Sequence, residues 1–555
     1  MYSIGLDFGT NSVRSLLLDL NYGKEIASAV FEYKSGEKGI ITSKTNPYQA
    51  RQNPADYLES MSESIINLIA SAKKLGINSE EISGIGVAAT ASTPLPTDET
   101  LTPLGLIEKF QNNPNAFAWL WKDHTSTKEA DEITNLAKKE KPYYIDNCGG
   151  SYSSEWFFSK IFHCLKADPE VFEAAFTWME LCDFIPAALC GIKDNKNLKR
   201  SVCGAGHKAM YQNPHGLPEK DFLEKLAPEM AVLRERLYTE VSLLDDVAGF
   251  LSDEWAKRLG LPVGIPVAVG GIDAHVGAIG SGIEDNLLIK NLGTSSCDIL
   301  ITSNKTITAI EGIAGVVPES VLPRFTGIEA GQAAVGDLFN WYVSKVLKRD
   351  VSSHQELTEQ ASKLKAGESG LLALDWNNGN RNILADQKLT GLILGQTTQT
   401  TDYEIYRALI EASAFGALSI INRLEESDNI KIDRVRNCGG IANKNPMVMQ
   451  IYANILGRPM EVVDNSQTVA LGAAIMGGFT ALKNSGKNIT IAELQKRSCR
   501  VNEKVYYPDL ESAKIYAKLY NIYKLLHDSF GKENSEMYSV MKDLLEIKIK
   551  ETSAD

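Results

Sequence analysis

The chain has 555 residues, of which 44% are hydrophobic, and its 57 Lys and Arg against 70 Asp and Glu give a formal net charge of −13. This length is more than one hydrophobic core usually organises, and it predicts roughly two to four domains. The acidic balance argues against a nucleic acid or an anionic membrane as a partner. It still allows a small anionic ligand that a few local donors surround.

Signals for targeting and disulfide formation are missing. No basic region precedes an apolar run at the N-terminus, and the longest uncharged run, 465–482, is too polar and too rich in glycine to span a bilayer. The eight cysteines show no CxxC spacing, which favours reduced thiols over a disulfide framework or a zinc site. We therefore expect a soluble, cytoplasmic protein; a homodimer is compatible with the sequence but not indicated by it.

The N-terminal segment predicts a meander of three strands, at Tyr2–Asp7, Ser12–Leu20 and Glu25–Tyr33. Asp7 ends the first strand. The turn that follows exposes backbone N–H groups beside small polar side chains and therefore suits a phosphate; its residues are Gly9, Thr10 and Asn11.

A long helix and a buried strand follow. Asn53 can cap the helix and Pro54 suits its first position, so the helix should run to about Leu75 and pack against a sheet. Ile82–Ala89 predicts a buried strand. The segment ATASTPLPTDE after it has the small residues and prolines of a substrate-facing loop, although an ordinary connection has the same composition.

Two tryptophans, Trp119 and Trp121, flank Leu120. If this segment is extended, alternation places both on one face, where one of them could cover a sugar ring. Burial in a core is the more common fate of tryptophan. His124 is likewise more often structural than catalytic.

Two helices are predicted at Ser151–Lys166 and Trp178–Leu189, and neither shows chemistry through its spacing. The segment SVCGAGHKAM differs, because Gly204 and Gly206 free the backbone just before Lys208. A lysine after a glycine loop can reach a hydroxyl or a phosphate, but a solvated lysine is the more common case.

The first domain is predicted to span residues 1–260. A helix at Glu254–Leu259 should end at Gly260, because Pro262 and Pro266 prevent it from continuing. A second domain would then span 261–505, and a charged, peripheral helical tail would span 506–555.

The stretch from Pro266 to Ile301 organises the rest of the chain. Val267–Val269 predicts a strand that stops at two glycines, and Asp273 follows at the start of a helix that reaches about Gly280. A carboxylate is thereby placed just beyond a strand end, where open α/β sheets bind their ligands.

The second half of this stretch repeats the start of the chain. Two short strands join through a turn that contains Gly293 and Thr294, and IGLDFGTNSVRSLLL aligns with this hairpin without a gap. Gly9 then meets Gly293, and Asp7 meets Asn291. Either hairpin alone could be chance, since Gly, Thr and Ser are ordinary turn residues. The ungapped pair predicts two related domains that face each other across a phosphate-binding cleft.

Two further elements carry candidate ligand contacts. Glu329 lies among small residues in FTGIEAGQAAVGD and could bind a ligand hydroxyl, although a carboxylate at a helix start is the plainer interpretation. Gly439 and Gly440 lie where a strand meets a helix that begins after Asn445. Two glycines at such a corner would let a flat ring such as adenine approach the backbone, although a tight turn needs them as well.

Several nucleotide and metal motifs are missing from the sequence. It contains no GxxxxGK[ST] loop, no HExxH and no EF-hand loop, and GAGHKA lacks the strand and helix of a dinucleotide fingerprint. If a nucleotide binds, it must do so through the paired hairpins. Closely packed helices are also predicted at 403–424 and 469–478.

Five motifs together resemble the FGGY family of carbohydrate kinases: DFGTNSVR, GGIDAHVGAIGSG, NLGTSSCDI, IEASAFGA and CGGIANKNPMVMQ. The similarity runs from about Tyr2 to Lys504. WLWKDHT, SVCGAGHKAM and FTGIEAGQ are similar to those members that phosphorylate L-ribulose. The resemblance implies an α/β fold of two actin-like (ribonuclease H-like) ATPase domains with a cleft between them.

The resemblance also implies roles for individual residues. Asp273 would be the general base for the sugar hydroxyl, and Asp7 would be the carboxylate on the magnesium side. Phosphates would be held by Gly9, Thr10, Asn11, Gly293 and Thr294. Adenosine would lie at Gly439, Gly440 and Asn445. The pocket of the sugar would be lined by Ala91, Trp121, Lys208, Asp273 and Glu329.

The activity implied is the transfer of phosphate from ATP, with Mg²⁺, to a ketopentose: L-ribulose to L-ribulose 5-phosphate, in arabinose catabolism. Members with this activity often carry an aspartate where this chain has Ala88, and this difference affects the expected sugar preference. Two alternatives remain at this point. One is another sugar or polyol kinase of the same family, such as a xylulokinase or a glycerol kinase; the other is an actin-like or chaperone-like ATPase with a protein partner.

Overall fold

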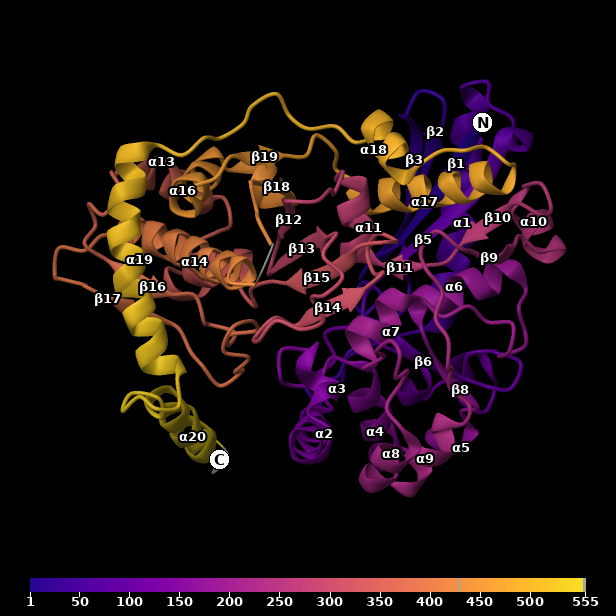
Figure 1. Cartoon of the computed structure of the whole chain (residues 1–555), viewed down its shortest axis with the longest axis horizontal. Helices are drawn as coiled ribbons and strands as arrows, with labels where there is room; N and C mark the ends of the chain where they lie inside the picture. The colour runs from indigo at the N-terminus through magenta and orange to yellow at the C-terminus, as the bar shows by residue number, and fades with distance from the viewer. Residues whose placement is uncertain (428–429, 553–555) are drawn as a thin grey trace. The chain divides into compact units, whose positions relative to one another are not determined.

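The computed structural model describes residues 1–427 and 430–552, and its chain divides into two compact units (Figure 1). The first unit comprises Met1–Ile283, Gly315–Gly327 and Gln467–Arg500. The second comprises Glu284–Ala314, Ile328–Ser466 and Val501–Asp555. Each unit thus combines separate segments of the chain. The sequence instead predicted three continuous ranges, 1–260, 261–505 and 506–555. The last three residues of the third range lie outside the described residues.

A mixed sheet forms the centre of the first unit, with strand order β3-β2-β1-β5-β10-β9 and with β11 paired to β5. The predicted N-terminal meander is confirmed to within one residue at each strand end. The strands of this sheet are β1 (Tyr2–Phe8), β2 (Ser12–Asp19), β3 (Lys24–Glu32), β5 (Ile82–Ala89), β9 (Val247–Phe250), β10 (Pro266–Ala268) and β11 (Gly271–Ile272).

Smaller strand pairs and many helices complete the first unit. Two short antiparallel pairs are β4 (Arg51–Gln52) with β7 (Ala118–Trp119), and β6 (Pro94–Thr97) with β8 (Thr177–Glu180). The strand β14 (Gly315–Pro318) also belongs to this unit. Its helices are α1 (Pro54–Lys74), α2 (Thr127–Glu140), α3 (Tyr143–Asp146), α4 (Phe157–Ala167), α5 (Pro169–Ala174), α6 (Leu181–Cys190), α7 (Val202–Lys208), α8 (Lys220–Leu226), α9 (Pro228–Arg234), α10 (Asp253–Leu259), α11 (Asp273–Gly280), α17 (Thr468–Asn484) and α18 (Ile491–Ser498).

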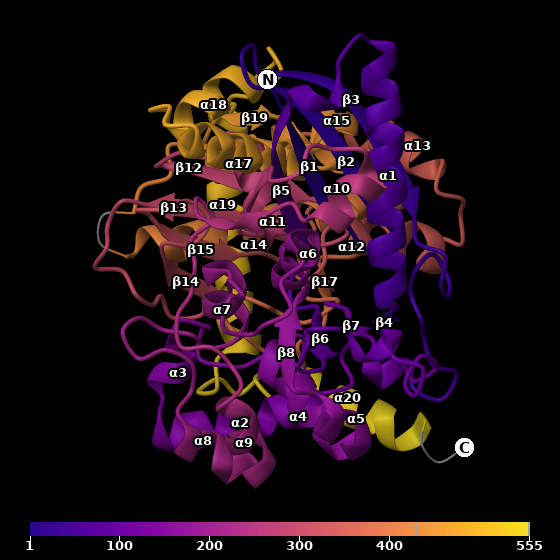
Figure 2. The ribbon, with the colours of Figure 1, turned by 90° about the vertical axis from the view of Figure 1, so that its right-hand side faces the viewer.

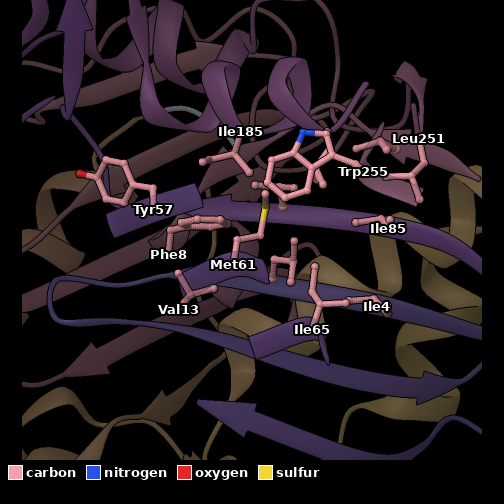
Figure 3. Close-up of a cluster of buried hydrophobic side chains, with 14 of the residues drawn as sticks. Ile4, Phe8, Val13, Tyr57, Met61, Ile65, Ile85, Ile185, Leu251 and Trp255 are labelled. Atoms are coloured by element: carbon pink, nitrogen blue, oxygen red, sulfur yellow. The ribbon is translucent and has the colours of Figure 1, made fainter. Parts of the chain in front are cut away.

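One face of the first sheet packs against α1, which lies beside β2 and β3 (Figure 2). The helix begins as predicted, because the side chain of Asn53 accepts a hydrogen bond from the backbone N–H of Ala55 and Pro54 occupies the first turn. Figure 3 shows apolar side chains from β1, β2, β5, α1, α6 and α10 directed into one shared core; those it labels include Ile4, Phe8, Val13, Met61, Ile65, Ile85, Ile185 and Trp255.

The other face of the first sheet is covered by α17, although this helix follows most of the second unit in the sequence (Figure 1). Glycines make the close approach possible. A Cβ added at Gly86 would lie 1.9 Å from the carbonyl oxygen of Ala473, and one added at Gly5 would lie 1.9 Å from that of Ala470. The predicted closely packed helix is therefore confirmed, but it is longer than the predicted 469–478.

The second unit repeats the central topology of the first. Its sheet runs β15-β13-β12-β18-β19, in which β12 pairs antiparallel with β13 and parallel with β18. In the first unit, β1 likewise pairs antiparallel with β2 and parallel with β5. The hairpins that align without a gap in the sequence thus occupy equivalent positions in two similar sheets. The strands of the second unit are β12 (Leu287–Leu292), β13 (Ser296–Thr302), β15 (Thr326–Ala330), β16 (Leu372–Leu374), β17 (Leu392–Leu394), β18 (Arg434–Cys438) and β19 (Met460–Val462).

In the predicted tail, the helix α19 (Leu510–Gly531) packs against α16 and β16 of the second unit. Its Tyr516 hydroxyl donates to Glu411 at 2.7 Å, and its Tyr523 hydroxyl donates to Asp375 at 3.0 Å; all four residues are buried. The predicted peripheral tail is thus tied to the unit by buried polar contacts. The other helices are α12 (Gly336–Trp341), α13 (Ser353–Ala361), α14 (Asp402–Glu425), α15 (Gly440–Lys444), α16 (Pro446–Leu456) and α20 (Val540–Thr552).

Three predicted elements of the first unit differ from the structure. The helix predicted at Ser151–Lys166 begins only at Phe157. The helix predicted at Trp178–Leu189 is wrong at its start, because 177–180 pair with β6 as the strand β8 and α6 begins at Leu181. The predicted glycine loop before Lys208 is the helix α7; a Cβ on Gly206 would lie 2.3 Å from Val317, so this glycine serves packing.

No helix in the described part of the chain combines the length and the apolar character that crossing a bilayer requires. The eight cysteines are thiols, as the sequence predicts.

Candidate active site

The two candidate carboxylates of the first unit lie at the same edge of its sheet. Register places Asp7 of β1 beside Ala88 of β5, and Ala88 beside Gly271 of β11. Ile272 then pairs with Ala89, and Asp273 follows directly. Because β1, β5 and β11 are parallel, Asp7 and Asp273 both lie where these strands end, which is where α/β sheets bind ligands.

Asp273 is the first residue of α11, as predicted, and its side chain is partly exposed. Its Oδ1 accepts a hydrogen bond from the backbone N–H of Ala274 at 2.7 Å. This bond and the positive end of the helix dipole both favour the ionised carboxylate. An ionised and partly exposed carboxylate can accept a proton from a ligand hydroxyl.

Asp7 is buried, with 5% of its surface exposed, and its Oδ2 accepts a hydrogen bond from Arg14 Nη1 at 3.0 Å. Burial raises the pKa of Asp7, and the charge of Arg14 and its hydrogen bond lower it again in part. A carboxylate at a strand end offers the oxygen ligands that Mg²⁺ prefers. The residue therefore fits the metal-side role that the family resemblance implies.

The turn between β1 and β2 is held from several sides. The backbone N–H of Gly9 donates to the carbonyl of Ser12 at 3.0 Å, and the side chain of Asn11 donates to the carbonyl of Lys38 at 2.7 Å. The turn thus has a defined shape before any phosphate binds.

Thr10, at the centre of this turn, contacts a predicted residue of the sugar pocket. Trp121 Nε1 donates to Thr10 Oγ1 at 3.1 Å, so the structure joins these two candidate residues. Gln52 Nε2 donates to the Thr10 carbonyl at 2.7 Å, and the Tyr57 hydroxyl donates to Gln52 Oε1 at 2.7 Å. Gln52 was not identified from the sequence, because its role depends on the pairing of β4 with β7.

The two tryptophans have different environments. The strand β7 ends at Trp119, so the alternation expected beyond it does not hold. Trp119 is fully buried, and the guanidinium carbon of Arg51 lies 3.3 Å from the centroid of its ring. Trp121 remains partly exposed. Of the two, only Trp121 can present part of its ring to a ligand.

Ala91 and Lys208 lie on separate elements of the first unit. Ala91 is partly exposed in the loop between β5 and β6, whereas Lys208 is buried at the end of α7. The Lys208 ammonium lies 5.7 Å from the centroid of the Trp156 ring. Two buried charged residues that the sequence analysis did not single out, Lys160 and Glu180, contact the Ala91 loop.

Ala88 lies inside the first unit and not on an open surface. It is fully buried in a small cluster with Val276 and Ala473, which come from α11 and α17. An aspartate at this position would place a carboxylate among these apolar groups, at a considerable cost in desolvation. The alanine is therefore compatible with the packing of α17 in this chain.

In the second unit, the turn between β12 and β13 contains Gly293 and Thr294. Their carbonyls accept hydrogen bonds from backbone N–H groups at the start of α12: Gly336 donates to Gly293 at 2.9 Å, and Val335 and Asp337 donate to Thr294 at 2.9 and 3.0 Å. These backbone bonds hold the turn in one conformation. The equivalent turn of the first unit, at residues 9–11, is held instead mainly by side chains.

The glycine corner at Gly439 lies at the same sheet edge as this turn. Cys438 pairs with Asn291, and a Cβ on Gly439, whose φ is 96°, would lie 2.5 Å from the Leu292 carbonyl. Gly440 differs, since nothing lies within 4 Å of a Cβ built there. The corner therefore offers open backbone surface to a flat ring, which fits an adenine.

The remaining candidates of the second unit are Asn445 and Glu329. The helix α16 begins after Asn445, as predicted; the Asn445 side chain caps it by accepting from the Val448 N–H at 3.2 Å, and its Nδ2 donates to Thr358 at 3.2 Å. Glu329 lies on β15 and is partly exposed, so it is a strand residue and not the helix-start carboxylate that was the plainer interpretation.

Comparisons with known proteins agree with this architecture. The signature of the FGGY family of carbohydrate kinases, N-terminal domain, matches residues 2–280, and that of the C-terminal domain matches residues 288–481. Among solved structures, the xylulose kinase from Rhodospirillum rubrum superposes with a TM-score of 0.78 at 20% identity, covering 96% of this chain and 99% of that chain. The gluconate kinase from Lactobacillus acidophilus gives 0.77 at 21% identity, with coverages of 96% and 98%. These likenesses confirm the predicted two-domain α/β fold.

Curated relatives are more similar in sequence. The ribulokinase of Vibrio parahaemolyticus is 41% identical over 501 residues, which cover 86% of this chain and 88% of the relative. That of Bacillus licheniformis is 37% identical over 560 residues, with coverages of 98% and 99%. Matches of both domain signatures and of relatives along nearly the whole chain lead to one conclusion: the chain belongs to the FGGY family of carbohydrate kinases.

Proposed function

We propose that the chain transfers the γ-phosphate of ATP to a ketopentose, converting L-ribulose to L-ribulose 5-phosphate in the cytoplasm. The support comes from relatives named ribulokinase that align along almost the entire chain. The structural observation that most supports the proposal is the strand register, which places Asp7 and Asp273 at one edge of the first sheet. The alternative of an actin-like or chaperone-like ATPase is not supported, because the matched family consists of carbohydrate kinases.

In this proposal Asp273 accepts the proton of the attacking sugar hydroxyl. Phosphoryl transfer depends mostly on positioning and on charge neutralisation, so a carboxylate of ordinary basicity is sufficient. The Ala274 N–H holds the Asp273 carboxylate at the start of α11 and fixes its direction. Trp121, Ala91, Lys208 and Glu329 would position the sugar, with Trp121 linked to the Thr10 turn.

The nucleotide would be bound by backbone groups. The turns at 9–11 and 293–294 would hold phosphates, and Gly439, Gly440 and Asn445 would hold the adenosine. Asp7 would hold Mg²⁺, which neutralises phosphate charge when bound. Gly440 supports this assignment, because the space beside its α-carbon is open.

The proposal is tested by measuring ATP turnover across a panel of sugars: L-ribulose, D-ribulose, D-xylulose, L-xylulose and ribitol, with glycerol and no sugar as controls. We expect L-ribulose to stimulate turnover most and to yield a 5-phosphate, identified by mass spectrometry and NMR. Stimulation by xylulose alone would assign the chain to another activity of the same family. Equal turnover with and without each sugar would contradict the proposal.

Trp121→Phe should weaken catalysis without unfolding the protein. Phenylalanine keeps an aromatic face but cannot donate to Thr10 Oγ1, so the turn loses one of its supports. The loss of one hydrogen bond of about 1 kcal/mol predicts a decrease of about fivefold in kcat/KM for the sugar. Steady-state kinetics measure this. Trp341→Phe, at an exposed site in the second unit, is the control and should change nothing.

A further inference from the structure

A single buried ammonium joins two segments of the proposed sugar pocket. Lys160 lies in α4 with none of its surface exposed. Its Nζ donates to the carbonyls of Ser92 at 2.5 Å, Leu120 at 2.8 Å and Trp119 at 3.2 Å. A lysine ammonium has three N–H donors, and all three are used here.

These carbonyls lie directly beside two candidate sugar contacts. Ser92 follows Ala91, and Leu120 precedes Trp121. Any movement of the Lys160 ammonium is therefore transmitted through one peptide unit to each of these residues. The two segments are far apart in the sequence, and Lys160 comes from a third element, α4.

The loop that Lys160 holds has a conformation that needs support. Ser92 has a φ of 51°, in the left-handed region that serine rarely adopts. The N–H of the same peptide group, from Thr93, donates to Glu180 Oε2 at 2.9 Å, and the Thr93 carbonyl accepts from the Leu181 N–H at 3.2 Å. Strained residues persist only where their surroundings fix them, and they concentrate at ligand sites.

Lys160 and Glu180 also influence each other's charge. Burial lowers the pKa of Lys160 to about 7, and the negative charge of Glu180 opposes this effect. Burial raises the pKa of Glu180 to about 7, and the charge of Lys160 opposes it in turn. The charge of Lys208 acts on both residues, so the pair lies close to another candidate sugar contact.

We propose that Lys160 and Glu180 are positioning residues of the acceptor site, which hold the Ala91 loop and the Trp121 segment at the spacing that selects the ketopentose. This inference rests on the proposed function, since that function assigns Ala91 and Trp121 to the sugar. The two residues bind the two ends of one peptide group, since Lys160 donates to the Ser92 carbonyl and Glu180 accepts from the Thr93 N–H, and they do not need to contact the substrate.

The decisive variant is Lys160→Met, which keeps the length of the stem and removes every donor. We expect the KM for L-ribulose to rise at least about tenfold, because several backbone carbonyls lose their partner at once. The KM for ATP should stay within about twofold, because the Lys160 ammonium bonds to none of the residues assigned to the nucleotide. The ratio of kcat/KM for L-ribulose over D-ribulose should fall toward one.

The controls separate positioning from simple structural damage. Lys166→Met changes an exposed lysine of the same helix that bonds to Glu132, and it should leave both KM values unchanged. Lys160→Arg retains the charge and the donors and should recover part of the sugar affinity. The melting temperature and ATP affinity of each full-length variant are measured alongside the kinetics.

If Lys160→Met does not fold, Glu180→Gln tests the same proposal. Its amide oxygen can still accept from Thr93, while the charge opposite Lys160 is removed, and we expect the sugar KM to rise about threefold or more with an unchanged KM for ATP. A folded Lys160→Met or Glu180→Gln with the wild-type sugar KM overturns the inference, and so does an equal rise in both KM values.

Failure of the proposed function would be seen earlier and separately. A wild-type enzyme that phosphorylates no ketopentose in the panel overturns the function, and the inference with it. A wild-type enzyme that prefers another ketopentose leaves the inference standing, and the same variants are then measured with that sugar.

Discussion

Asp273→Asn is expected to lower sugar phosphorylation by about 100-fold or more, toward the background rate, while ATP binding stays nearly intact. The asparagine side chain has almost the same shape and can still accept the hydrogen bond from the Ala274 N–H, so the start of α11 should be preserved. It cannot take up a proton from the acceptor hydroxyl. The rate is measured by a coupled assay with saturating sugar, and ATP affinity by calorimetry.

The matched control for this variant is Asp253→Asn. Asp253 is also the first residue of a helix in the first unit, α10, but it is exposed and lies away from the strand ends that carry Asp7 and Asp273. Its replacement should leave turnover unchanged. Wild-type turnover by Asp273→Asn would remove this residue from the role of general base, and a parallel loss of ATP affinity would indicate a binding role instead.

Features with local signals were predicted from the sequence. The cap at Asn53 and the proline after Asn445 mark the helix starts that the structure has, because such signals depend only on their own neighbours. The hairpin repeat also predicted the equivalent positions of β1–β2 and β12–β13. The position of Asp273 beyond a strand end followed from the glycines before it.

Features that depend on distant partners were not predicted. Residues 177–180 pair with β6, and this pairing overrides the helical pattern that continues into α6. The turn at Thr10 is supported by Gln52 and Trp121, whose proximity only the folded chain reveals. Lys160 did leave a signal, since a lysine stands among the apolar residues of FFSKIF, but its carbonyl partners could not be deduced.

The domain boundaries also depend on contacts between distant parts of the chain, so local sequence patterns did not predict them. Gly260 ends α10 as predicted, and yet the first unit takes in α11 and, much later in the chain, α17. No local pattern links Gly86 to Ala473. Their contact exists because two backbones approach where neither side chain intervenes. The first unit is therefore completed only by a segment that follows the sheet of the second unit in the sequence.

Gly86→Ala should destabilise the first unit by about 3 kcal/mol or more, because the added methyl group has no space. Its Cβ would lie 1.9 Å from the carbonyl oxygen of Ala473 and 2.9 Å from the backbone nitrogen of Gly477. Both atoms belong to the main chain of α17, so no side chain can rotate away. The helix must move off β5, and the contacts along β1 and β5 weaken together.

The matched comparison for Gly86→Ala is Gly277→Ala in α11. The free energy of unfolding of both variants is measured by urea unfolding followed by circular dichroism. A Cβ on Gly277 would meet Val469 Cγ2 at 3.1 Å, which is the end of a side chain and can shift by a few tenths of an ångström. The gain in helix propensity from alanine offsets part of that cost, so the net change should be below about 1 kcal/mol. Equal unfolding midpoints for the two variants would contradict the close packing of α17 on the sheet. A large loss for Gly86→Ala alone would establish that this late segment of the chain is an integral layer of the first unit.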